Sequence, residues 1–126
     1  MSRYDELPVY KATYDLILGI FRFTKDFTRE YKYTIGEKLK NETLDLIILI
    51  YRANSKKNKV ETLQSAREHI EVIRLLLRLL KDLRQINLKK FVTINKLVEN
   101  VSKQITGWQK SESKKNDKPE SFNAMV

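Results

Sequence analysis

Apolar residues recur three or four positions apart along most of this chain, which is the period of an α-helix. Four segments carry the pattern, and we predict helices over residues 8–28, 34–53, 60–85 and 88–108. Short polar connections separate these segments, so the sequence predicts an all-α fold, an antiparallel up-down-up-down four-helix bundle. The main apolar seams are Val9, Leu16, Ile20, Phe23 and Phe27; Ile35, Leu39, Leu46, Leu49 and Ala53; Leu63, Ala66, Ile70, Ile73, Leu77 and Leu80; and Phe91, Ile94, Val98, Val101, Ile105 and Trp108.

Residues typical of helix ends flank these segments. Thr34 stands three positions before Glu37, the spacing of a capping box, in which both side chains accept hydrogen bonds from free backbone N–H groups. Asn87 follows the third segment and is a suitable N-cap for the fourth. Gly107 fits the end of that last helix.

The C-terminal residues are polar and have no helical period. We therefore divide the chain into a four-helix bundle domain, residues 1–110, and a disordered polar tail, residues 111–126.

Three of the four segments carry apolar residues beyond the main seam. A four-helix bundle needs one apolar stripe on each helix, so the additional stripes predict a second buried surface, most simply a homo-oligomer interface. The alternative is one unusually wide core within a single chain. The additional stripes are Tyr10, Tyr14, Ile17 and Phe21; Leu44, Ile47, Ile48 and Tyr51; and Val72, Leu76, Leu79 and Leu83.

The net charge of +9 is unevenly distributed along the chain. Residues 1–53 hold nine basic against eight acidic residues, whereas residues 54–110 hold thirteen against five. Such a concentrated positive field attracts polyanions or an acidic protein surface, although it can also serve solubility alone. No apolar run approaches the roughly 20 residues of a membrane span, the N-terminus does not resemble a secretory signal, and no cysteine occurs. We expect a cytoplasmic protein without membrane contact.

The sequence offers little for catalysis or metal binding. His69 is the single histidine, and we expect it to be a hydrogen-bonded core or interface residue rather than a ligand. Glu42 with Asp45 and Glu68 with Glu71 are spaced three apart, but no nucleophile, base or glycine-rich phosphate loop accompanies them. We predict no catalytic residue, no cofactor and no metal site.

Basic residues form two rows at helical spacing. On the third segment the row lies on one face, and on the fourth it repeats every seven residues opposite the apolar seam. Two such rows on neighbouring helices would merge into one surface that binds phosphates without reading bases, extended by two cations where the helices connect. The candidate nucleic-acid-binding residues are Arg67, Arg74, Arg78 and Lys81, Lys89, Lys96, Lys103 and Lys110, with Arg84 and Lys90 at the connecting end.

Three stretches, in this order, resemble one protein family. They are the residues YTIGEKL at 33–39, RLLLRLLKDLR at 74–84 and the pair Gly107-Trp108. Over residues 7–110 the chain is similar to the accessory variability determinants of diversity-generating retroelements. Their four-helix superfamily also contains proteins encoded by intervening sequences of bacterial ribosomal RNA genes.

The resemblance implies a homopentameric barrel of four-helix bundles with a basic exterior. It implies a non-catalytic partner of the reverse transcriptase that binds RNA or DNA and supports mutagenic reverse transcription. A ribosomal intervening-sequence protein and a basic protein-interaction scaffold remain alternatives. An enzyme with a site at the bundle end is a further one, which measured turnover or bound metal would favour.

Overall fold

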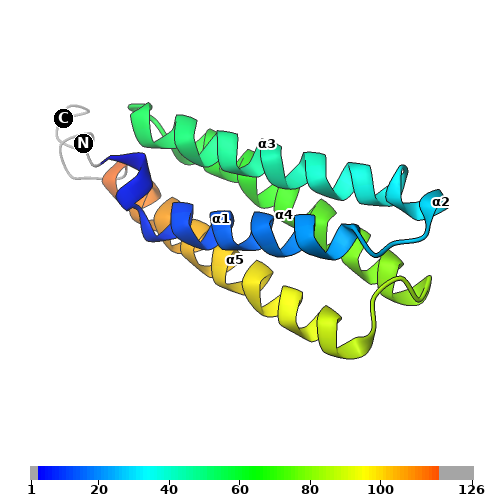
Figure 1. The fold of residues 1–126 in the computed structure, drawn as a ribbon. Coiled ribbons are helices and arrows are strands. Elements are labelled where there is room, and N and C mark those ends of the chain that lie inside the picture. The colour runs from blue at the N-terminus through cyan, green and yellow to red at the C-terminus, as the bar shows by residue number, and fades with distance from the viewer. Residues whose placement is uncertain (1–2, 117–126) are drawn as a thin grey trace, which may run out of the picture.

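The four long helices run alternately in opposite directions and form one bundle (Figure 1). The structure is a computed structural model that describes residues 3–116. The helices α1 (Pro8–Thr24), α3 (Ile35–Ser55), α4 (Val60–Asp82) and α5 (Leu88–Asn116) form the bundle, and the short helices η1 (Tyr4–Glu6) and α2 (Arg29–Lys32) accompany them. Both α1 and α4 pack against α3 and α5. The all-α four-helix prediction is confirmed for the described residues.

The predicted seams form the core of the bundle. Each seam residue is buried or half-buried, because its period keeps one side of every helix turned inward. Burying one such aliphatic side chain stabilises the fold by about 1.5–3 kcal/mol relative to leaving it exposed. The largest fully buried side chains are Leu16, Ile20, Leu39, Leu46, Ile50, Leu63, Ile70, Ile73, Leu77, Leu80, Val98 and Ile105.

The link between the first two long helices differs from the prediction. Helix α1 ends at Thr24 instead of residue 28, and a turn follows that buries Phe27 under the bundle end. Gly36 permits this packing, since a Cβ there would lie 3.1 Å from the Tyr31 carbonyl oxygen and 3.3 Å from the Phe27 ring. The apolar period continues to Phe27, although the backbone helix does not.

The capping-box prediction at Thr34 is wrong in its mechanism. Thr34 does precede the first residue of α3, but its hydroxyl donates a 2.8 Å hydrogen bond backward to the Glu30 carbonyl oxygen. Glu37 pairs with Lys40 at 3.4 Å instead of accepting from the N-terminal backbone. The N-cap prediction at Asn87 is confirmed, because its Oδ1 accepts from the Lys90 N–H at 2.8 Å.

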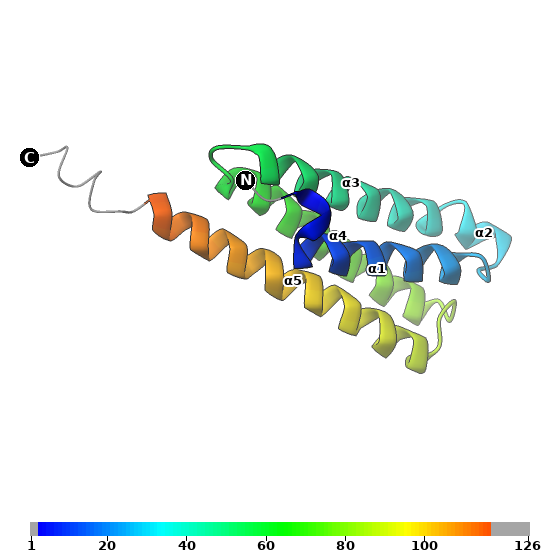
Figure 2. The ribbon, with the colours of Figure 1, turned by 60° about the vertical axis from the view of Figure 1, so that its left-hand side comes forward.

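Helix α5 is longer than predicted and continues to Asn116. Gly107 lies inside it, so the predicted helix end at Gly107 is wrong. Gln109 explains the extension, since its Nε2 donates to Val60 O and Gln64 Oε1 at the start of α4, and Glu112 is buried beyond it. Figure 2 shows the last turns of α5 projecting past the first turn of α1. The predicted tail thus differs over residues 111–116, and residues 117–126 lie outside the described part.

The turn between α4 and α5 has a left-handed residue, Arg84, with φ of 61°. Arg84 N–H donates to Lys81 O at 3.0 Å and Gln85 N–H to Leu80 O at 2.9 Å, which together form a Schellman motif. The Gln85 side chain then accepts from the Thr28 N–H at 3.0 Å. This end of the bundle is therefore held by a contact between its two turns.

None of the helices described over residues 3–116 is long and apolar enough to cross a membrane.

Candidate nucleic-acid interface

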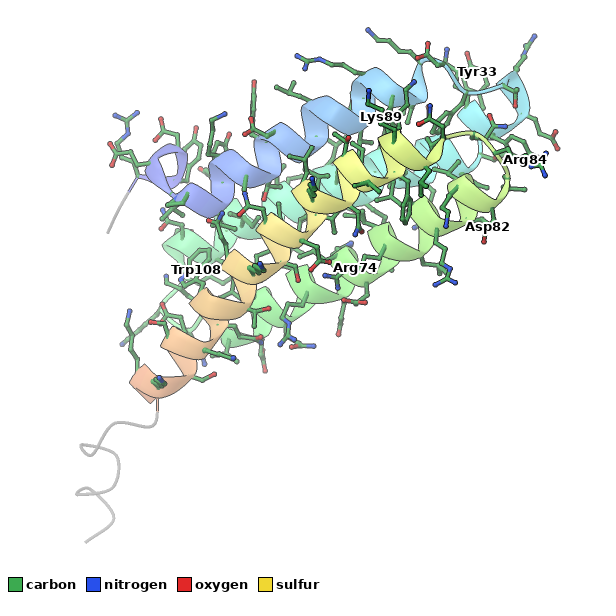
Figure 3. The ribbon with its side chains drawn as sticks, turned by 90° about the horizontal axis from the view of Figure 1, so that it is seen from below. Tyr33, Arg74, Asp82, Arg84, Lys89 and Trp108 are labelled. Carbon is green, nitrogen blue, oxygen red and sulfur yellow. The ribbon has the colours of Figure 1, made fainter. Side chains whose placement is uncertain are left out.

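The basic row of α4 lies along its contact with α5. Arg67 Nη1 donates a 2.8 Å hydrogen bond to Gln109 Oε1, and Lys81 Nζ lies 5.1 Å from the centroid of the Phe91 ring. Between them, Arg74 Nη2 donates to Glu99 Oε1 at 2.6 Å. These partners all belong to α5, so the row borders the groove between the two helices, as Figure 3 shows for Arg74.

Arg74 is the candidate residue whose charge is best compensated. Its guanidinium bridges Glu71 on its own helix and Glu99 on α5, and its side chain is 30% exposed. Two carboxylates around one guanidinium leave little net field for a phosphate. The structure therefore places Arg74 as a cross-link between α4 and α5 within the predicted surface.

The α5 row has a different character. Lys89, Lys96, Lys103 and Lys110 are exposed and make no ion pair with any residue from 3 to 115. Seven residues of helix advance about 10.5 Å, so successive lysines stand roughly three nucleotides apart along a strand of a duplex. Arg78 on α4 is likewise exposed and without an ion pair in the described chain. These side chains form an uncompensated cationic surface, here named the basic face: Arg78, Lys89, Lys96, Lys103 and Lys110.

The two predicted residues at the connecting end differ in their surroundings. Arg84 is exposed in the left-handed turn between α4 and α5, where Figure 3 labels it. Lys90 instead faces α1, where its Nζ lies 3.8 Å from Asp26 Oδ2 and 5.8 Å from the Phe23 ring centroid. Arg84 therefore belongs to the turn, whereas Lys90 is directed toward α1.

Arg22 was missed by the sequence analysis. It lies on α1 and lines a groove together with Lys89 and Lys90. Its relevance depends on the antiparallel packing of α1 against α5, which brings the end of one beside the start of the other. The predicted topology alone could have provided that signal.

The opposite side of the bundle, around α1 and α3, is apolar. Tyr51 is 52% exposed and its ring centroid lies 4.7 Å from that of Tyr4, which in turn lies 5.2 Å from Tyr10. Burial raises the pKa of Tyr10, and neighbouring Tyr4 and Tyr14 raise it further, so this phenol stays neutral. The exposed apolar side chains here define the aromatic face: Tyr4, Tyr14, Leu18, Leu44, Ile48 and Tyr51.

A second apolar surface lies on α4. Leu75 is 64% exposed and Leu79 is also exposed, one turn further along the same side of the helix. Neither belongs to the core or to the basic row. Of the twelve residues in the additional stripes of the sequence, five are exposed, seven are half-buried and none is fully buried, so the stripes do not form one wide core.

Between the aromatic and basic faces, a hydrogen bond joins α3 and α4. His69 Nδ1 contacts a carboxylate oxygen of Glu42, whose other oxygen lies 3.0 Å from Lys38 Nζ. Burial by itself would raise the pKa of Glu42, but the hydrogen bonds from His69 and Lys38 outweigh it and lower the pKa below its usual value. His69 is a hydrogen-bonded interface residue, as expected.

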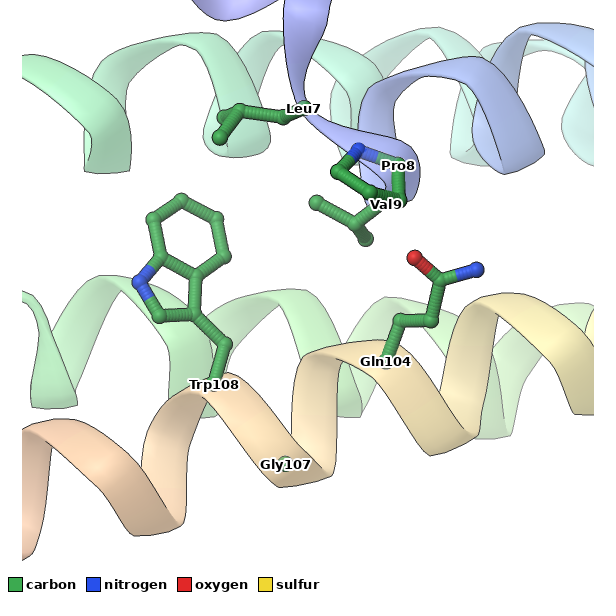
Figure 4. Close-up of a pocket in the computed structure, with 6 residues that line it drawn as sticks. All are labelled: Leu7, Pro8, Val9, Gln104, Gly107 and Trp108. Carbon is green, nitrogen blue, oxygen red and sulfur yellow. The ribbon is translucent and has the colours of Figure 1, made fainter. Parts of the chain in front are cut away.

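The described residues contain no group of three or more potential metal-binding side chains. A small apolar pocket of about 270 Å³ lies between the start of α1 and the end of α5. In Figure 4 the Trp108 ring points from α5 toward Leu7, across from Val9. Its lining offers no titratable side chain, so the pocket has no groups for acid–base chemistry.

A comparison with models of known protein families gives a match. A family model described as bAvd-like matches residues 8–112, which cover all four long helices nearly to their ends. No curated protein matches the chain significantly.

Proposed function

Because the chain belongs to the bAvd-like family, we propose that it is a non-catalytic accessory protein of a diversity-generating retroelement. In this role it binds nucleic acid through the basic face and accompanies the reverse transcriptase during mutagenic copying. The proposed partnership with the reverse transcriptase rests on the family membership. The observation that carries the nucleic-acid role is the row of α5 lysines that make no ion pair with residues 3–115, because uncompensated cations at regular spacing attract a phosphate backbone.

The exposed apolar surfaces support assembly of several copies. A closed ring requires two different surfaces on every copy, since each copy contacts one neighbour on either side. The aromatic face and the Leu75–Leu79 surface lie on different helices and satisfy this requirement. A homopentamer, as the resemblance implies, would leave the α5 lysines available on its exterior.

Fluorescence anisotropy with a labelled RNA tests the nucleic-acid role. We expect binding that weakens steeply with salt and changes little with sequence. The variant Lys96→Glu/Lys103→Glu should bind roughly tenfold or more weakly at about 100 mM salt, with a salt slope lower by about two.

The matched control is Lys56→Glu/Lys57→Glu, which changes net charge equally in the α3–α4 connection, outside the basic face. Equal losses of RNA affinity in both variants would show that net charge, rather than the basic face, determines the binding. Binding that survives high salt would contradict the proposal.

A further inference from the structure

A groove lies at the seam of α1 and α5, next to the first turn of α5. Its volume is about 510 Å³, within the range typical of small-molecule sites. The lining consists of Gly19, Arg22, Phe23, Asn87, Lys89, Lys90, Thr93, Ile94 and Leu97. The groove therefore combines apolar and cationic side chains.

The floor of the groove depends on Gly19. A Cβ at that position would lie 3.2 Å from Ile94 Cδ1 and 3.4 Å from Leu97 Cδ1. A larger side chain at residue 19 would therefore occupy the space above the two aliphatic side chains. With Phe23 beside it, the floor presents a surface of aliphatic and aromatic carbon to anything that enters.

The rim of the groove is positive. Arg22 and Lys89 are exposed and make no ion pair with the described residues, and Lys90 has one 3.8 Å contact to Asp26. Lys90 Nζ also lies above the Phe23 ring, so one cation already covers part of the aromatic floor. An occupant that fits has a flat apolar part and a negative charge close to it.

We propose that this groove receives an unstacked base of single-stranded RNA or DNA, with the adjoining phosphates on Arg22 and Lys89. The inference rests on the proposed function and adds to it a preference for single strands. Lys89 carries the argument, because it belongs both to the groove and to the basic face. A strand that follows the lysines of α5 is thereby led to the groove, where a base gains contact with apolar carbon.

Two oligonucleotides of equal charge test the proposal. One is a single-stranded DNA of twelve adenines, and the other has the same backbone with abasic tetrahydrofuran units in place of the nucleotides. Base stacking on protein side chains predicts that the abasic strand binds about fivefold to a hundredfold more weakly. A pure phosphate interface predicts equal affinity for both.

The groove itself is tested by filling it. Gly19→Leu should remove most of the difference between the two strands, while Gly107→Leu, where the new Cβ meets nothing within 4 Å, should keep it. If Gly19→Leu fails to fold, Thr93→Leu narrows the groove from an exposed position without adding an aromatic ring, with Asn100→Leu seven residues along α5 as its control.

The outcomes separate the inference from the function it rests on. Equal binding of both strands by the native protein, with the usual salt dependence, overturns the groove proposal and leaves the basic face intact. No binding of either strand overturns both. A base preference that persists in Gly19→Leu and Thr93→Leu places the base elsewhere and also overturns the groove proposal.

Discussion

The aromatic face and the basic face arise from the same helical period but use it differently. On α1 and α3 the positions beside the core seam hold tyrosine, leucine and isoleucine, whereas on α5 the positions opposite the seam hold lysine. Contact with another protein would remove the apolar side chains of the first face from water, so this face suits a protein partner. The second repels a copy of itself and suits a polyanion. The aromatic face and the basic face thus lie on opposite sides of one core.

The largest expected effect comes from placing a charge on the aromatic face. Ile48→Glu inserts a carboxylate at an exposed position, so the bundle should fold while its assembly fails, because a buried unpaired charge costs several kcal/mol. Light scattering should then report a single chain of 15.0 kDa. Lys103→Glu adds the same side chain to the basic face and should leave the mass of the assembly unchanged. An unchanged mass for Ile48→Glu would exclude the aromatic face as an interface.

The second effect concerns Glu42, which contacts Lys38 and His69 between the two faces. The pKa of Glu42 is lower in the folded protein than its ordinary value of 4.5, so its ionised form stabilises the bundle above about that pH. This contribution is lost as pH falls through the lowered pKa. Glu42→Gln should therefore reduce the free energy of unfolding by about 2 kcal/mol at pH 7 and by much less at pH 3.

Urea unfolding at both pH values measures this difference. Glu61→Gln is the control, since Glu61 is exposed and has no ion pair in the described chain. A loss for Glu42→Gln that is equal at pH 7 and pH 3 would contradict an ionic origin.

A residue's surroundings could be predicted from the sequence where its own helix determines them. They could not be predicted where a second helix contributes. The core seams were predictable because period alone turns Ile70 or Val98 inward. The compensation of Arg74 was not, because Glu99 stands 25 residues away and meets it only after α4 and α5 pack. The end of α5 was misjudged for the same reason, since Gln109 finds its partners on α4. Local capping rules also failed at Thr34, where α2 supplies a competing acceptor.

A third, smaller effect sharpens the basic face. Glu99→Gln removes a carboxylate from the boundary of the two basic rows and releases one partner of Arg74. Affinity for RNA should rise about two- to fivefold, with a salt slope steeper by about one, because only Glu71 then remains to compensate the Arg74 charge. Anisotropy measures both quantities. Glu68→Gln removes an exposed carboxylate of α4 and should raise the affinity less; an equal rise would assign the effect to net charge.

The smallest effect concerns Arg84. Its left-handed backbone costs an arginine about 1 kcal/mol, which glycine avoids, although glycine also loses more entropy on folding. Arg84→Gly should therefore raise the free energy of unfolding by up to about 1 kcal/mol while slightly weakening RNA binding. Thermal unfolding measures the change in stability, and anisotropy measures the change in RNA affinity. A destabilised variant would indicate that the arginine side chain stabilises the turn.

The seam between α1 and α5 has a consequence for the order of folding. The other neighbouring pairs of long helices follow one another along the chain, whereas α1 and α5 come from opposite ends of the bundle sequence. Contacts between distant segments cost the most loop-closure entropy, so we expect this seam to close after the consecutive helix pairs have formed. The groove at the seam exists only in the finished bundle. A ligand bound there would therefore select completely folded molecules and raise their thermal stability with the logarithm of its concentration.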